Sequence, residues 1–444
     1  MLRSTKTHLL VVRSLFVGTA SLFWAIGPHH VSAQTFESGS TGADGALVLT
    51  TPGVIDFDPR DLGLNPDGDH IFHFTSINIG SGVVVKLTDR HFSGPVYWLA
   101  SGDVTIDGTL NLDGEDGLVG SDYQTPGSRR PAIPGAGGYP GGIGRFGLDH
   151  PPEPGAGPGG GEGALRLLTE DQRCCYSDNG GGAGHFTEGD AFGHIRGGKA
   201  YGNNFLVPLI GGSGGGGGTG NGFIVAGHRV GGGGGAGGGA ILIASSSSIT
   251  VNGLITAQGG YGSNDGPGRG TPGAGGGGSS GAIRLVADTI QGTGAINAPD
   301  ARNGWGTGFA PGRVRFEASD IRFTGTVNPA PSVSSPSRLF LPVRKPPKLV
   351  ALTVNDNPVA SDPTGSFEFP DVTIDGGHAA VIIIGASDVL PGTVVRVHVN
   401  SENAPDQVVN SEPLTGSQES STATVTLDLP PGFSRGSLRA VWTE

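Results

Sequence analysis

Short runs of alternating apolar and polar residues recur along the chain and predict β-strands. In one run Ile283 and Leu285 face one way and Arg284 the other, so the two apolar residues are expected to point inward and Arg284 outward. No segment after the N-terminal leader shows convincing helical periodicity. Four segments repeat one arrangement of three short strands: VYWLASGDVTIDGTLNLDG from Val96, AILIASSSSITVNGLITAQGG from Ala240, AIRLVADTIQGTGAINAPD from Ala282 and VRFEASDIRFTGTVNPA from Val314.

A glycine occupies the same place between the second and third strand of each repeat, at Gly108, Gly253, Gly294 and Gly325. Asp107 and Asn252 precede two of these glycines, and such pairs favour turns with a positive φ. Each repeat has the length of about one solenoid coil, and a coil buries its apolar face only when others stack on it. The repeats predict a short parallel β-helix with equivalent places for the strands that hold Ile106, Val251, Ile290 and Phe323.

Glycine-rich insertions interrupt the predicted coils. The fixed glycines are separated by 145, 41 and 31 residues, which places insertions at about 114–239 and 259–281. The insertions leave the coils at one phase, so they are expected on one side of the stack. The chain has 85 glycines in 444 residues. Two interpretations stay open: a flexible linker, and packed polyproline-II-like rods whose backbones approach closely. The nearby tyrosines and the apolar NFLVPLI at 204–210 favour packing.

The composition changes after Val333. Residues 334–347 are rich in proline and predict a linker, and 348–444 hold about seven strand-like runs separated by turn signals. That spacing is typical of an immunoglobulin-like or fibronectin-III-like sandwich, here without cysteines. The predicted fold class is therefore all-β: a short parallel β-helix over 34–333 with one-sided glycine-rich insertions, followed by a C-terminal β-sandwich.

The first 33 residues predict a secretory signal peptide. Arg3 and Lys6 precede an apolar stretch, and Val31-Ser32-Ala33 fits a cleavage site before Gln34. Cleavage removes three cations and no acidic residue, so the formal net charge changes from −12 to −15. We expect a secreted or cell-surface protein with no membrane span in the mature chain. Nucleic acid is not an expected partner, because phosphate contacts need clustered Lys and Arg.

The candidate catalytic residues are the carboxylates of TIDGTLNLDGEDG, namely Asp107, Asp113, Glu115 and Asp116. A glycosidase needs two carboxylates about 5–10 Å apart, and β-helices host such enzymes, although a fold does not imply a function. The NTD, DD, His-Gly and RIK motifs of pectin hydrolases do not occur in the sequence. Ser213 in GGSGG has the spacing of a nucleophile elbow, but no helical pattern follows it.

A calcium site is the single cofactor that the sequence suggests. Asn65, Asp67 and Asp69 alternate in LNPDGDH, as ligands do in calcium-binding loops. A polar turn explains the same run equally well, because His70 stands where glycine is expected. Cys174 and Cys175 are adjacent and do not form a disulfide framework.

Three stretches, GDVTIDGTLNLDG, NFLVPLIGGSGGGGG and LPPGFSRGSLRAVW, give the chain a family likeness. It resembles a group of uncharacterised exported glycine-rich bacterial proteins that combine short β-helix coils with a C-terminal immunoglobulin-like sandwich. The resemblance covers most of the mature chain. The group has no assigned activity, so the resemblance implies no catalytic residues.

We expect a surface, matrix or glycan-binding structural protein without catalytic activity, whose partner is an extracellular polysaccharide or matrix. Aromatic rings on a platform of small residues stack on sugars, which makes Tyr201, Tyr261 and Trp305 the candidate binding residues. Packing of these rings against the scaffold is the equal alternative. The rival function is a β-helix carbohydrate-active enzyme, a polysaccharide lyase or glycoside hydrolase of unknown mechanism. An ice- or mineral-binding surface would need a more regular strand sequence.

Overall fold

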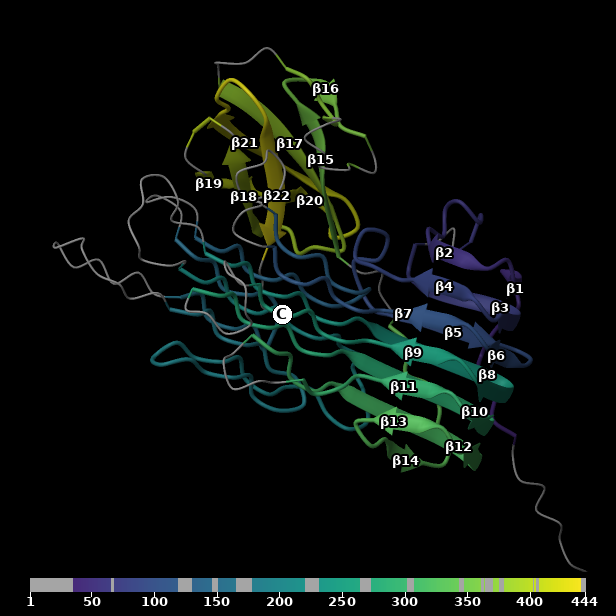
Figure 1. The fold of residues 1–444 in the computed structure, drawn as a ribbon. Coiled ribbons are helices and arrows are strands. Elements are labelled where there is room, and N and C mark those ends of the chain that lie inside the picture. Colours follow the sequence, from purple (N-terminus) through teal and green to yellow (C-terminus); the bar gives the residue numbers. More distant parts are fainter. Residues whose placement is uncertain are drawn as a thin grey trace, which may run out of the picture. The chain divides into compact units, whose positions relative to one another are not determined.

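The computed structural model describes residues 35–64, 68–118, 130–145, 151–164, 178–219, 231–263, 273–301, 307–342, 347–360, 363, 370–374, 379–401, 403–404 and 407–440. The chain divides into two compact units, 1–35 and 36–444, and the architecture given below belongs to the second. Within the described ranges every regular element is a strand, as the alternating pattern predicts (Figure 1). These ranges hold no helix of the length and apolar character needed to cross a bilayer.

Strands β1 to β14 form two parallel sheets. In hydrogen-bonding order, sheet A holds β1 (Gly45–Leu49), β3 (Ile71–Ile79), β5 (Val96–Ala100), β8 (Ala240–Val251), β10 (Ala282–Gly292), β12 (Arg313–Phe323) and β14 (Ser332–Ser334), with β6 (Val104–Ile106) between β3 and β8. Sheet B holds β13 (Thr326–Asn328), β11 (Ala295–Asn297), β9 (Leu254–Thr256), β7 (Thr109–Asn111), β4 (Val83–Lys86) and β2 (Gly53–Asp56). We call β1 to β14 with their connections the parallel region.

The repeats pair with one another in parallel, as their alignment predicts. Ile106 of β6 pairs with Val251 of β8, as expected. Ile290 of β10 is level with Ile249 of β8 and Ile321 of β12, so the strands that hold the four named residues do occupy equivalent places.

Inward side chains of successive strands stack in columns and form one core that draws on both sheets. On sheet B the column consists of Ile55, Val85, Leu110, Ile255, Ile296 and Val327. On sheet A one column consists of Phe72, Trp98, Ile243, Leu285, Phe316 and Val333. The four middle members of each column are at most 2% exposed.

The other face of sheet A is also buried, which alternation alone does not predict. Leu206 and Leu209 of the NFLVPLI stretch pack there with Leu242 and Val286, and Leu339 from the proposed linker packs against the same cluster. Arg284 does point to this face, as expected, but it is only 2% exposed. The segment 36–40 also crosses sheet A. Its backbone and hydroxyl groups bond in turn to β10, β8, β5 and β3, through Phe36 N to Asp288, Ser38 N to Ser246, Ser38 Oγ to Ala100 O, and Ser40 Oγ to Phe74 O.

The described glycine-rich segments are packed and hydrogen-bonded, so the flexible-linker interpretation is wrong for them. Residues 231–239 donate their N–H groups to three neighbouring segments in rotation: to Arg145, Gly142 and Tyr139, to Gly273, Gly276 and Ser279, and to Leu118, Glu115 and Leu112. Because each neighbour receives every third N–H, the segment has three residues per turn, as polyproline-II-type helices do. We call the described segments within 112–239 and 257–281 the glycine bundle. Figure 1 shows it leaving the strands on one side, as predicted.

The C-terminal residues form two antiparallel sheets. One holds β16 (Asn357–Pro358), β15 (Lys348–Val354), β17 (Ala379–Ser387), β21 (Ser421–Asp428) and β20 (Thr415–Gly416), and the other holds β19 (Gln407–Pro413), β18 (Val394–Ser401) and β22 (Ser434–Ala440). Buried residues from both sheets, including Ile384, Val397 and Val425, share one apolar cluster. Burial alternates residue by residue along β21, as the sequence pattern predicts.

Candidate functional site

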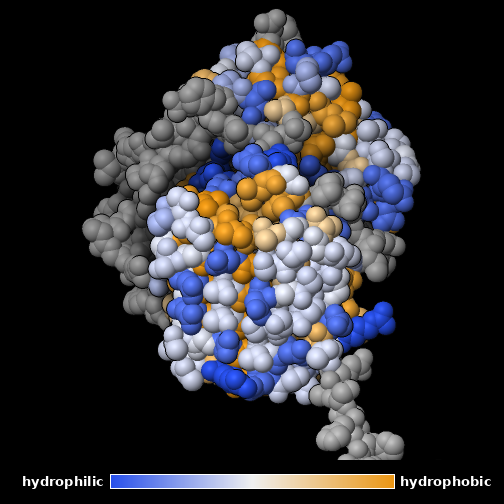
Figure 2. Space-filling model, turned by 90° about the vertical axis from the view of Figure 1, so that its right-hand side faces the viewer, coloured by the Kyte–Doolittle hydropathy of each residue, from blue (hydrophilic) through white to orange (hydrophobic). Residues whose placement is uncertain are grey.

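A groove crosses the strands of sheet B at the bends that carry the repeated glycines. Its volume is about 450 Å³, and its lining runs from β4 to β13, so the groove crosses the stacked strands. The lining residues are Gly82, Val83, Val84, Asp107, Gly108, Thr109, Asn252, Gly253, Leu254, Thr293, Gly294, Ala295 and Thr326. These bends lie at the right-hand end of the strands in Figure 1, and Figure 2 views that end, where pale and blue residues predominate over its lower half.

Close backbone packing explains the repeated glycines, and the expected positive φ does not occur at them. A Cβ atom at Gly253 would overlap the carbonyl oxygen of Gly108, and one at Gly294 would overlap that of Gly253. Gly325 meets Gly294 in the same way. The prediction of positive-φ turns is therefore wrong. Glycine is needed at these bends because the backbone lies against the carbonyl of the previous bend. Gly108, Gly253 and Gly294 also line the groove.

The polar groups of the groove are hydroxyls, one amide and one carboxylate. Asn252 Nδ2 donates to Asp107 Oδ1 over 2.9 Å, and both residues are exposed. Thr109 of β7, Thr293 of the bend before β11 and Thr326 of β13 add three hydroxyls. Leu254 and Ala295 occupy the two strands between Thr109 and Thr326. Hydroxyl and amide groups both donate and accept hydrogen bonds, so this lining suits a ligand that carries hydroxyl groups.

Asp113 lies outside this groove and is held by its neighbours. It accepts hydrogen bonds from Thr256 Oγ1 at 2.7 Å, Gln258 N at 2.7 Å and Asn111 Nδ2 at 3.1 Å. Burial raises the pKa of Asp113 above its usual value, against the effect of these donors. With these three hydrogen bonds, the Asp113 carboxylate holds the start of the glycine bundle in place.

Glu115 and Asp116 also make structural contacts. Glu115 Oε2 accepts from Arg130 Nη1 over 2.6 Å and from the N–H of Ile133 over 3.1 Å. Asp116 Oδ1 accepts from the N–H of Tyr261 over 2.7 Å. Of the four candidate carboxylates, only Asp107 lines the groove.

Tyr201 lies within a polar cluster of the glycine bundle. Its hydroxyl donates to Gly211 O over 2.5 Å and accepts from Ser213 Oγ over 3.0 Å. Its ring stacks on His185, with 4.7 Å between centroids. Burial raises the pKa of Tyr201 and lowers that of His185 to about 4. Ser213 is fully buried, so its hydroxyl is not accessible as a nucleophile.

The other candidate aromatic residues differ in their placement. Tyr261 is half-buried and packs edge-on against Phe309, with 4.9 Å between centroids, while Trp305 lies outside the described residues. Phe186 and Phe205 are more exposed, at 45% and 66%. Their rings lie over Arg313 and Arg315, and no pattern in the sequence singles them out.

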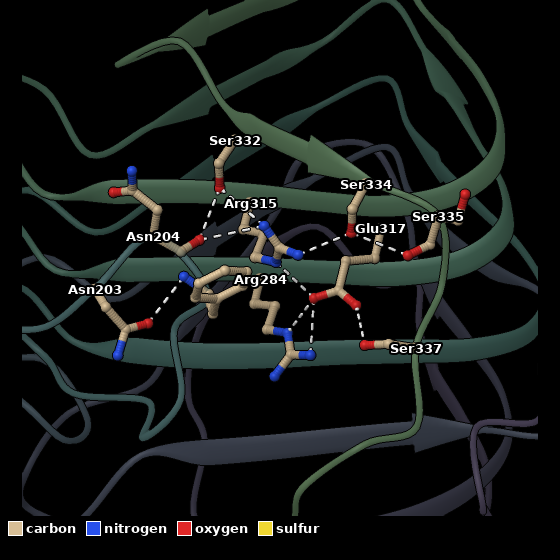
Figure 3. A network of polar contacts seen from close by, with 10 residues as sticks. Asn203, Asn204, Arg284, Arg315, Glu317, Ser332, Ser334, Ser335 and Ser337 are labelled. Carbon is tan, nitrogen blue, oxygen red and sulfur yellow. Dashed lines mark hydrogen bonds and ion pairs between the residues drawn. The ribbon is translucent and has the colours of Figure 1, made fainter. Parts of the chain in front are cut away.

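A buried charged network lies on the outer face of sheet A (Figure 3). Glu317 Oε1 accepts from Arg284 Nε over 2.9 Å and from Arg315 Nε over 2.6 Å, and the carboxylate is fully buried. Ser337, in the segment after β14, donates to Glu317, and Ser334 of β14 accepts from Arg315. Burial alone would raise the pKa of Glu317, but the hydrogen bonds from Arg315 and Ser337 and the charge of Arg284 bring it below its usual value. The network holds segments of the chain together.

The calcium prediction falls partly outside the described residues. Asn65 and Asp67 lie there, as do Cys174 and Cys175. Asp69 accepts a hydrogen bond from Ile71 N over 2.9 Å, as expected if the run forms a polar turn before the strand. Among the residues that the structure describes, no three His, Cys, Asp or Glu side chains are placed to hold a metal ion.

Comparisons with protein-family models, with curated proteins and with solved structures each give no match for this chain.

Proposed function

We propose that this chain is an exported protein without catalytic activity that binds an extracellular polysaccharide in the groove across sheet B. The groove itself is the observation that carries the proposal. It is lined by the carboxylate of Asp107, the amide of Asn252 and the hydroxyls of three threonines, together with apolar positions such as Leu254 and Ala295. A polysaccharide offers both hydroxyl groups for the polar side chains and C–H faces for the apolar ones. The predicted signal peptide supports an extracellular location.

We infer that the parallel region is a short β-helix and that residues 348–444 form an immunoglobulin-like sandwich. Support for the β-helix comes from the chain alternating between sheets A and B, with parallel pairing at each return. Support for the sandwich comes from two antiparallel sheets that share one buried cluster.

The polysaccharide lyase or hydrolase remains the rival, and the groove favours binding over it. Hydrolysis of a glycosidic bond uses two carboxylates, and Asp107 is the one carboxylate among the described residues that line the groove. The aromatic platform stays a prediction for Tyr261 and Trp305. For Tyr201, the contacts with Gly211 and His185 are those of a packed ring.

Blocking the groove tests the proposal. Ala295 lines the groove and is half-buried, so Ala295→Trp fills it with a large ring. The chain from Gln34 is screened on a glycan array, and the affinity for the polysaccharides that bind is then measured by calorimetry. Ala295→Trp and the double variant Asp107→Ala/Asn252→Ala are expected to weaken binding at least tenfold.

Ala46→Trp provides a matched control, because Ala46 is an exposed residue of β1 that does not line the groove. It should bind like the unmodified chain. Binding that survives both groove variants would move the site elsewhere, first to Tyr261. Release of new reducing or unsaturated ends from a bound polysaccharide would establish the enzyme instead.

A further inference from the structure

The core of the parallel region is uncovered at its C-terminal end. Along sheet A, one inward column runs from Leu47 through Ile77, Val104, Ile249 and Ile290 to Ile321. Ile290 is fully buried, whereas Ile321, the last member, is 38% exposed. The second column ends in the same way, since Phe316 is 2% exposed and the next residue, Val333, is 57% exposed. These residues face the core, and their exposure follows from being last in the stack.

The N-terminal end of the same columns is closed. Leu47 is 5% exposed and Phe72 is fully buried, although each is the first member of its column. Phe57, which follows β2, is also fully buried, and its ring lies 6.1 Å from that of Phe72 and 5.7 Å from that of Trp98. Stacked repeats need a cap at each end, and among the described residues this chain provides one only at the N-terminal end.

Unpaired strand edges lie at the open end. β13 is the last strand of sheet B, and β14 pairs with β12 only over Arg315–Glu317. No described strand therefore pairs with the outer edge of β13 or with that of β12 beyond Glu317. Edges of this kind offer free N–H and C=O groups to another strand.

We propose that the open end binds a second copy of this chain around a two-fold axis, so that two open ends close one another. Antiparallel pairing centred on Ile321 places apolar residues of the two copies together. It also sets Arg322 opposite the partner's Asp320. Arg322 and Asp320 are 69% and 41% exposed and lie 2.5 Å apart within one chain. The two-fold axis brings Arg322 of each copy opposite Asp320 of the other, so two pairs of opposite charges form. Directly opposite residues interact across an antiparallel pair of strands.

The closed N-terminal end limits the assembly to two chains. A head-to-tail contact would need an open end at both termini of the stack and would extend into filaments. Here an open end meets only another open end, so an isologous dimer results.

Sedimentation of the chain from Gln34, over a range of concentrations, tests the proposal. The unmodified chain is expected to sediment as a dimer. The variant Ile321→Glu/Val333→Asp should sediment as a monomer with an unchanged circular dichroism spectrum, because both positions are exposed within one chain. Val48→Asp is the matched control: Val48 is also 57% exposed but lies on β1, at the closed end, so it should remain a dimer.

A charge exchange tests the geometry of the contact. Arg322→Glu places two acidic residues opposite one another and should increase the dissociation constant at least tenfold. Adding Asp320→Arg restores opposite charges at the two positions and should recover the dimer. A monomeric unmodified chain, an open-ended polymer, or a dimer unaffected by Ile321→Glu/Val333→Asp would overturn the proposal.

Discussion

A single methyl-bearing side chain inside the glycine bundle should destabilise the parallel region. We choose Gly234→Val, in the segment that donates to three neighbours in rotation. A Cβ at Gly234 would overlap the carbonyl oxygen of Gly215 and lie 2.5 Å from its carbonyl carbon, where real Cβ contacts essentially never fall below 3.0 Å. The obstructing atoms are backbone, so no rotamer change relieves the overlap and a whole segment must move.

The cost follows from two terms. Overpacking of a well-packed interior costs about 1–3 kcal/mol. Moving the segment also strains the bonds from Gly234 N to Gly142 O and from Gly215 N to Gly235 O, which are 2.8 and 2.9 Å long. Each contributes about 0.5–1.5 kcal/mol net. The expected loss in the free energy of unfolding is therefore about 2–6 kcal/mol, and each kcal/mol lowers the melting temperature by about 2–4 °C in a domain of 150–250 residues.

Differential scanning calorimetry of the chain from Gln34 measures the effect, and Gly216→Val repeats the test at a second site. There a Cβ would overlap the carbonyl oxygen of Glu162. Gly436→Val is the control for the substitution itself, because a Cβ at Gly436 meets no atom within 4 Å. Unchanged melting in both bundle variants would refute close packing and restore the flexible-linker interpretation.

Two further predictions concern the buried charges and the C-terminal sheets. Glu317→Gln leaves the buried Arg284 and Arg315 without a countercharge and should cost about 3–5 kcal/mol in urea unfolding. The pKa of Glu317 is depressed in the folded chain, so the carboxylate stabilises the fold above a pH of about 4.5, and this stabilisation is lost as the pH falls through the lower folded pKa. The variant Glu317→Gln should therefore lose less stability than the unmodified chain over that acid range. Residues 348–444 expressed alone should unfold cooperatively with a β-type spectrum, since both sheets share their own core; an unstructured fragment would show that its boundary is misplaced.

The strands of the parallel region were predictable because their information is local. A two-residue alternation and a recurring glycine mark each strand and bend. Arg284 shows where locality ends. Its direction follows from alternation, but its burial depends on residues 204–209 and 335–341, which are distant in the sequence and cover the sheet. The groove likewise depends on contacts between distant parts of the sequence, since Asp107 and Asn252 meet in it although they are 145 positions apart.

Glycine has two structural roles in this chain, and both follow from the missing Cβ. At the bends it lets one backbone lie directly on the next, and in the bundle it lets each segment contact several others. Glycine loses more conformational entropy on folding than any other residue, and the bundle has few side chains to bury in return. Its stability must come from backbone hydrogen bonds, which each segment shares with several neighbours. Losing one segment leaves donors and acceptors unpaired in the others, so the interior of the bundle should tolerate little variation. Changes in binding specificity should therefore arise at side chains with free space, as along the groove of sheet B.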